Sequence, residues 1–227
     1  SSRWCTDEAL LSRMFALSEA GPEDQVLDVA CGTGLVSAAF HGRVGHLVGV
    51  DLTPAMFEQA RPHVDELVPG RGEALPFADD RFNVVVCRQG IQFMDAPAAL
   101  AEMVRVCAPG GRIVLADLCA YGPEDRDEYF EVLRLRNPAR RNFFVEGDVA
   151  ALLFEAGCEA VEVHRYVSTE DVDAWSDNEA ISEARREGIR DVYRNASAAF
   201  RRVHAVSSED QRHFFDHMLF DLSIGRV

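Results

Sequence analysis

A turn of small residues near the start of the chain has the composition of turns that bind a ligand through their backbone. A mostly apolar run at residues 26–29 is followed by Ala30, Gly32 and Gly34, and then by an apolar stretch at residues 35–40. This order predicts a buried strand, a tight turn and a helix, which together open a nucleotide-binding α/β unit. Because glycine has no Cβ, a ligand could lie directly on the backbone of this turn.

Two carboxylates accompany the turn. Asp51 ends a second apolar run, residues 47–50, about 20 positions after the turn, where an acidic side chain can accept hydrogen bonds from the ribose hydroxyls of an adenosine. Asp28 lies inside the first run. A carboxylate at that position suits a cationic group, such as the amino group of a methionine moiety, better than a pyrophosphate.

The glycine spacing separates two classes of nucleotide cofactor. Dinucleotide sites have the pattern G-x-G-x-x-G, in which the third glycine lets the helix pack closely on the strand. The frame from Ala30 reads A-C-G-T-G-L, and the frame from Gly32 reads G-T-G-L-V-S. Neither frame supplies the third glycine, so the pattern disfavours a dinucleotide site.

The surrounding elements predict the sheet that would position these residues. Apolar runs that alternate with helical patterns and Pro/Gly breaks predict a doubly wound α/β fold with a mostly parallel, seven-stranded sheet. Ligands of such sheets bind outside the carboxyl ends of the strands. We expect strands at residues 26–29, 47–50, 71–74, 82–87, 112–118 and 161–167, with an antiparallel closing strand at 217–227. We expect helices at residues 4–17, 35–40, 53–61, 98–106, 124–136 and 148–155.

Several segments together resemble one enzyme family. Leu-Asp-Val-Ala-Cys-Gly-Thr-Gly at residues 27–34 resembles motif I of the class I S-adenosylmethionine (SAM)-dependent methyltransferases. Residues 48–56, 73–82 and 103–118 are similar to later motifs of its ubiquinone and menaquinone biosynthesis branch. The resemblance covers roughly residues 20–165 and the closing strand. It is specific for a Rossmann-like fold and the cofactor, and it says little about the substrate.

The resemblance implies a set of cofactor-binding residues along the cleft. Asp28 and the backbone of Ala30, Gly32 and Gly34 would face the methionine end, and Asp51 would hold the ribose. Leu52 and Met56 would flank the adenine, and Gly72 and Glu73 would lie at its edge. Arg88 and Gln89 would lie beside the methionine and the sulfonium.

Two positions depart from the family pattern. Ala30 replaces the first glycine of the turn, and Arg71 stands where relatives often have an aspartate. An aspartate would accept a hydrogen bond from the adenine amino group, whereas arginine only donates. Glu73 is the alternative acceptor for that amino group.

No general base can be assigned from the sequence. Gln89, Gln92 and Arg141 are the candidates for contact with the substrate. The histidines are interpreted as structural: His164, His204, His213 and His217.

Composition narrows the function classes. The chain has 227 residues, 48% of them hydrophobic, which predicts one domain over residues 1–227, and no apolar run approaches the length of a membrane span. The formal net charge of −15 argues against nucleic acid as substrate. All 23 basic residues are arginines, so lysine Schiff-base chemistry is excluded. Six cysteines without a C-x-x-C pair indicate buried thiols, a cytoplasmic location and no metal site.

The sequence therefore predicts an enzyme that transfers the methyl group of SAM to a small molecule and releases S-adenosylhomocysteine (SAH). Residues 120–144 and 168–213 would cap the substrate side, and the first of these could close as a lid. Because residues 120–144 contain several aromatic residues and arginines, an aromatic, quinone-like or carboxylate-bearing acceptor is one interpretation. Carbon, oxygen or nitrogen acceptors and the oligomeric state stay open. The alternatives are a SAM-fold binding module without methyl transfer and, with less support, an NAD-dependent oxidoreductase.

Overall fold

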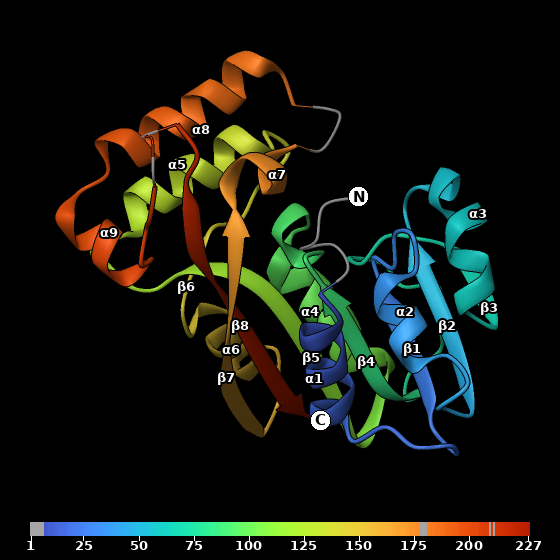
Figure 1. Ribbon diagram of the computed structural model, residues 1–227. Helices are drawn as coiled ribbons and strands as arrows, with labels where there is room; N and C mark the ends of the chain where they lie inside the picture. Colours follow the sequence, from blue (N-terminus) through green and yellow to red (C-terminus); the bar gives the residue numbers. More distant parts are fainter. Residues whose placement is uncertain (1–6, 178–180, 209, 211) are drawn as a thin grey trace.

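A computed structural model describes residues 7–177, 181–208, 210 and 212–227 of the chain. Within these residues, one sheet has the strand order β3-β2-β1-β4-β5-β8-β7, with the short β6 beside β5. The pairs β5–β8 and β8–β7 are antiparallel and the others are parallel. The predicted mostly parallel α/β sheet with an antiparallel closing strand is confirmed, and β6 adds to the predicted seven (Figure 1). The strands are β1 (Gln25–Val29), β2 (His46–Asp51), β3 (Glu66–Pro69), β4 (Phe82–Arg88), β5 (Cys107–Ala120), β6 (Phe144–Val145), β7 (Ala160–Asp171) and β8 (Phe215–Arg226).

The predicted position of the third strand is wrong. The strand lies at Glu66–Pro69, where it pairs in parallel with β2, and not at residues 71–74. Arg71 and Ala74 form only an isolated antiparallel bridge. β3 is short and partly exposed at the edge of the sheet, so its apolar pattern is weak, and an edge strand tolerates Pro69 because a proline has no N–H to donate.

Helices cover both faces of the sheet and one end of it. Asp7 is the N-cap of α1, because its side chain accepts hydrogen bonds from the N–H groups of Ala9 and Leu10. The first residues of the helix predicted at 4–17, and Cys5, lie outside the described residues. The helix predicted at 53–61 is divided into short 3₁₀ and α turns. The helical elements are α1 (Glu8–Ser18), α2 (Leu35–Phe40), η2 (Pro54–Met56), α3 (Phe57–Ala60), η3 (Arg61–His63), η4 (Ile91–Phe93), α4 (Ala96–Val106), α5 (Arg126–Arg136), α6 (Asp148–Glu155), α7 (Val172–Ser176), α8 (Glu183–Asn195) and α9 (Ala198–Val203).

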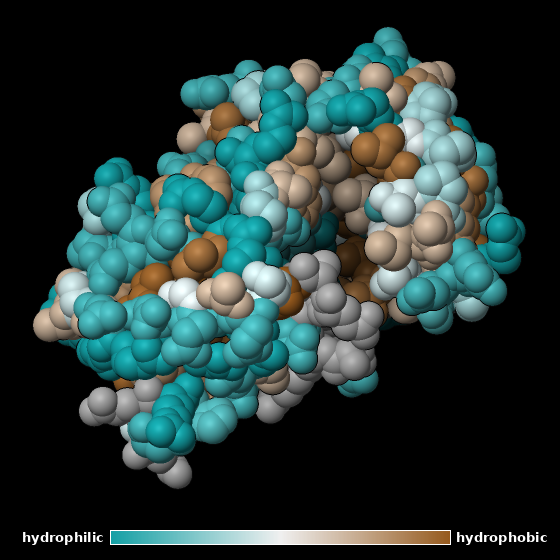
Figure 2. Space-filling view, turned by 90° about the horizontal axis from the view of Figure 1, so that it is seen from above, coloured by the Kyte–Doolittle hydropathy of each residue, from teal (hydrophilic) through white to brown (hydrophobic). Residues whose placement is uncertain are grey.

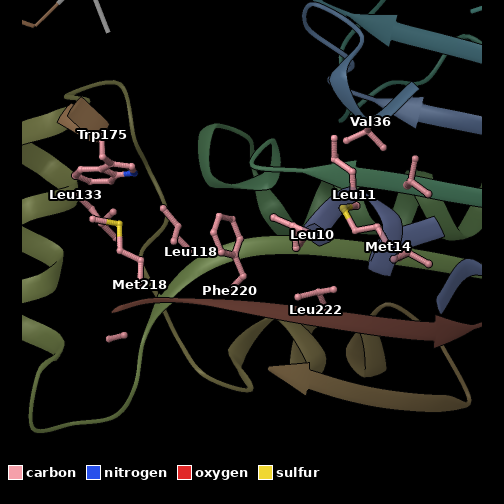
Figure 3. Packing of buried hydrophobic residues seen from close by; sticks show 14 of the residues in the cluster. Leu10, Leu11, Met14, Val36, Leu118, Leu133, Trp175, Met218, Phe220 and Leu222 are labelled. Atoms are coloured by element: carbon pink, nitrogen blue, oxygen red, sulfur yellow. The ribbon is translucent and has the colours of Figure 1, made fainter. Parts of the chain in front are cut away.

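The hydrophobic core forms two layers, one on each face of the sheet. Neighbouring strand residues alternate between them: Val84 and Val86 of β4 belong to one layer, and Val85 to the other. Figure 3 shows part of the first layer, where Leu10 and Met14 of α1 lie near Leu222 of β8. The second layer packs α4 and α6 against the sheet. The alternation follows from the two-residue period of a strand.

Four helices, α5, α7, α8 and α9, stand together beyond the β7 end of the sheet (Figure 1). We call them the cap. The polar composition of residues 168–210 predicts a mostly helical segment, but β7 continues to Asp171 before α7 begins. α5 packs against α8. No helix among the described residues combines the length and apolar character that a bilayer crossing requires.

A buried ionic network joins the cap to the sheet. His204, at the end of α9, is completely buried and places Nδ1 2.8 Å from Asp216 Oδ1 and Nε2 3.0 Å from Asp125 Oδ2. The phenol of Tyr193 donates to the second oxygen of Asp216. Because both ring nitrogens face carboxylates, the imidazole is charged. Burial lowers the pKa of His204, but the two carboxylates outweigh burial and raise it to about 9.

This network predicts a pH dependence of stability. The His204 pKa lies above its unfolded value of 6.5, so its stabilising contribution is complete below pH 6.5 and is lost as the pH rises toward about 9. The loss should be on the order of 3 kcal/mol. In urea unfolding at pH 6, 7.5 and 9, the free energy of unfolding should fall more steeply with pH for the wild type than for His204→Gln. Parallel profiles for the two proteins would contradict the charged assignment.

Candidate active site

The turn after β1 holds a left-handed backbone at three positions. Ala30, Gly32 and Gly34 have φ of 57°, 53° and 82°. At Gly34 a Cβ would come 2.9 Å from the Cα of Ala60, so a side chain is excluded by α3 as well as by the dihedral angle. Ala30 adopts the conformation that glycine favours, and this explains why the family pattern has a glycine there.

Asp51 connects this turn to the loop that follows β2. Its Oδ2 accepts the N–H of Gly32 at 2.9 Å, and its Oδ1 accepts the N–H of Thr53 at 2.8 Å. A carboxylate can accept about four hydrogen bonds, so capacity is left for hydroxyl groups of a ligand. The residue ends β2 beside the carboxyl end of β1, which is the edge where the fold binds ligands.

Asp28 lies behind the turn and does not line the cleft. Its side chain is 1% exposed, and its Oδ2 accepts a hydrogen bond of 2.6 Å from the hydroxyl of Ser37 on α2. Burial raises the pKa of Asp28 to about 7, with Asp51 acting in the same direction, while the Ser37 bonds and the charge of Arg88 oppose the rise. The carboxylate therefore supports the turn from beneath.

A cleft of about 370 Å³ opens at this edge of the sheet, a size within the usual range for small-molecule sites. Figure 2 shows the molecule from above, with a hollow near the centre of this face and hydrophobic residues inside it. Eight of the residues predicted to bind the cofactor line the cleft: Ala30, Gly32, Asp51, Leu52, Met56, Gly72, Glu73 and Gln89. Three others, Asp28, Gly34 and Arg88, are not among its lining residues.

Three exposed apolar side chains line the cleft. Leu52 and Met56 on one loop and Phe93 after β4 are 62%, 39% and 37% exposed, which is unusual for large apolar residues. An exposed apolar group inside a concavity indicates a ligand surface. The sequence interpretation missed Phe93 and Met94, although both directly follow the strand that delivers Gln89 to the same edge.

Of the three candidates for substrate contact, only Gln89 lines the cleft. Gln89 has φ of 55°, and its side-chain nitrogen Nε2 is buried without a hydrogen-bond partner among the described residues. Gln92 is 4% exposed, and its backbone carbonyl accepts N–H bonds from Arg141 and Asn142. The side chain of Arg141 is exposed. The structure does not bring these three side chains together in the cleft.

Asp117 is a buried acid that the sequence interpretation did not single out. The signal was present, because Asp117 interrupts an apolar run in β5. It is completely buried opposite Asp221 of β8, and neither oxygen has a hydrogen-bond partner in the described part of the chain. Burial raises the pKa of Asp117 to about 8; Arg140 opposes the rise and Asp221 adds to it. Among the described residues, no group of three or more His, Cys, Asp or Glu could hold a metal ion.

Comparison with known proteins identifies the fold. A family model described as a methyltransferase domain matches residues 27–115. The crystal structure of YcgJ from Bacillus subtilis superposes with a TM-score of 0.88 at 24% identity, over 96% of this chain and 98% of that one. Residues 27–115 thus match a methyltransferase domain, and the chain has the fold of the class I SAM-dependent methyltransferases.

Sequence relatives of this methyltransferase domain carry several names. YcgJ, an uncharacterised methyltransferase, is 36% identical over 57% of this chain and 54% of its own length. A demethylmenaquinone methyltransferase of Renibacterium salmoninarum is 38% identical over 54% of each protein. The chain thus spans about half the length of these relatives. A geranyl diphosphate C-methyltransferase of Streptomyces coelicolor, solved with Mg²⁺, geranyl diphosphate and SAH, shares the fold at 17% identity, with a TM-score of 0.64 over 97% of this chain and 78% of that one.

The two buried acids, Asp28 and Asp117, predict a second pH effect. The pKa values of Asp28 and Asp117 lie above the ordinary value of 3.8, so both residues oppose folding increasingly as the pH rises from about 4 to 7 or 8. Asp28→Asn and Asp117→Asn should each raise the free energy of unfolding at pH 8 by about 1–3 kcal/mol, and give little gain at pH 4.5.

Urea unfolding at the two pH values measures this effect, and Asp127→Asn, at a highly exposed acid, serves as the control with no expected gain. A variant that is less stable than the wild type at both pH values would show that its carboxylate has a stabilising partner.

Proposed function

We propose that the chain binds SAM in the cleft and transfers its methyl group to a small-molecule acceptor. The observation that carries the proposal is the Asp51 carboxylate, fixed between Gly32 and Thr53 at the mouth of a glycine turn. A carboxylate with spare acceptor capacity suits the two hydroxyls of a ribose. The methyltransferase domain in which it lies supports the same ligand.

The residues present fit this cofactor along the whole cleft. Leu52 and Met56 offer apolar surface to a flat base. The backbone at residues 30–34 would face the methionine end, and the buried negative charge of Asp28 would favour its ammonium group. Gln89 would lie near the sulfonium, whereas Arg88 is not among the residues that line the cleft. When bound, SAM supplies an electrophilic methyl group, and SAH is the product.

The protein's own contribution is alignment and exclusion of water. Gln89, which lines the cleft, carries a neutral amide that can orient an acceptor but cannot take up its proton. Alignment of two reactants can supply up to about 7–11 kcal/mol of the barrier reduction. We therefore assign the chemistry to positioning and leave the general base unassigned.

The main alternative cofactor, NAD, has less support. The position of the third glycine in a dinucleotide pattern is occupied by Ser37, whose hydroxyl is held by buried Asp28. A binding module without methyl transfer would keep the same cleft, and turnover with an acceptor distinguishes it from an enzyme.

We propose that the cap segments 120–144 and 168–213 cover the acceptor side. Tyr129 and Phe144 are buried in the core, which favours a fixed cover over a mobile lid. Arg136 donates to the carbonyl of Trp175, and Arg140 donates to the carbonyls of Asn142 and Leu118. Because both guanidinium groups bind the chain's own backbone, they favour a neutral acceptor, aromatic or quinone-like, over one bearing a carboxylate.

The five described cysteines are buried free thiols, which fits a cytoplasmic location. We propose that the reaction takes place in the cytoplasm.

Asp51→Ala should weaken SAH binding at least tenfold, about 1.4 kcal/mol, because the ribose loses its acceptor and the turn loses its anchor. Calorimetric titration measures the effect. Glu58→Ala is the matched control, since it removes one negative charge from an exposed position on the neighbouring α3 without touching the cleft, and its Kd should stay within twofold of wild type. Tight NADH binding by the wild type, with no response to SAM or SAH, would refute the proposal.

Nucleic acid should not accept the methyl group, because a chain with a net charge of −15 and no lysine repels phosphates. With radiolabelled SAM, incorporation into bulk tRNA and DNA should equal that of heat-inactivated protein. A panel of phenols, quinols and amines should contain at least one acceptor that is labelled above this background. Enzymatic labelling of tRNA or DNA would overturn the acceptor class.

A further inference from the structure

One arginine, Arg71, is among the described residues that line the cleft. Arg71, Gly72 and Glu73 line the cleft together with Leu52 and Met56. They directly follow β3, and the N–H of Gly70 binds the carbonyl of Asp51. A base that extends from a ribose held at Asp51 would therefore reach these residues, so the inference below rests on the proposed function.

Glu73 is already engaged by the protein. Its Oε1 accepts the N–H of Asp95 at 3.0 Å, and Asp95 is the N-cap of α4. Its Oε2 lies 3.7 Å from Nε of Arg71, and the side chain is 18% exposed. Glu73 thus holds the start of α4 and steadies Arg71, which makes it a weak candidate for accepting a hydrogen bond from a ligand.

Arg71, in contrast, has its charged group available to a ligand in the cleft. Its side chain is 60% exposed, and only its Nε side meets Glu73. The two terminal nitrogens make no hydrogen bond to any residue that the structure describes. The backbone of Arg71 is fixed, since its carbonyl accepts the N–H of Ala74 at 3.2 Å. The side chain therefore starts from an ordered backbone, and its guanidinium group is accessible from the cleft.

A guanidinium only donates hydrogen bonds. It cannot pair with the 6-amino group of adenine, but it can donate to the ring nitrogens of a purine and to a 6-oxo group, and arginine binds O6 and N7 of a 6-oxopurine in bidentate fashion. We propose that Arg71 reads the edge of the base through its acceptor atoms. The cleft then tolerates a 6-oxopurine in place of adenine.

Calorimetry with SAH and S-inosyl-L-homocysteine, its 6-oxo analogue, tests this directly. The two Kd values should agree within threefold for the wild type. In Arg71→Asp the new carboxylate accepts from the amino group and opposes the oxo group, so the analogue should bind at least tenfold more weakly than SAH. Arg71→Met should weaken both ligands by a similar factor, about three- to tenfold.

Arg61→Asp is the matched control, because it makes the same charge change at an exposed residue of η3 outside the cleft, and it should leave the ratio of the two Kd values at its wild-type level. Circular dichroism confirms that each variant is folded. If SAH binds but the ratio is the same in the wild type and Arg71→Asp, Arg71 does not read the base and the inference is wrong. If the wild type binds neither ligand, the proposed function itself fails.

Discussion

The site depends on the Asp51 carboxylate, which joins two loops that belong to different strands. By accepting N–H bonds from Gly32 and Thr53, it fixes the turn after β1 relative to the loop after β2. The cleft between them is consequently formed by backbone that is already ordered. A ligand bound there meets preorganised groups, which reduces the entropy lost on binding.

Buried charge in this protein is distributed in two ways. In the sheet, burial raises the pKa values of Asp28 and Asp117; the hydrogen bond from Ser37 opposes the rise at Asp28, and Asp221 adds to it at Asp117. Between the cap and the sheet, Asp125 and Asp216 are compensated by the imidazolium of His204. The cap network is a fully paired structural element, whereas acids without compensation are more often found where a protein gives up stability for function.

The sequence predicted the fold well because its strands and turns carry strong local signals. The apolar runs of β1, β2 and β4 and the motif around Asp51 were located correctly. β3 was misplaced because an edge strand needs few apolar residues. The burial of Asp28 beneath the turn depends on the contact with Ser37, which spacing alone does not reveal.

Contacts between distant segments were the least predictable. Glu73 was considered as an acceptor for the base, but its bond to the N–H of Asp95 joins positions 22 residues apart. The partners of His204 lie 12 and 79 residues away, so the sequence indicated a structural histidine but not its charge. Asp117 was visible as an acid in an apolar run, yet its cost depends on Asp221 in a strand near the other end of the chain.

The central claim is that the cleft is built for a SAM-type nucleoside rather than a dinucleotide. Native mass spectrometry of the protein with equimolar SAM, SAH, NAD⁺ and NADH tests it most directly, since all four ligands compete for one site in one sample. The account predicts a single adduct with the mass of SAM or SAH. An adduct with NAD⁺ or NADH and none with SAM or SAH would contradict it.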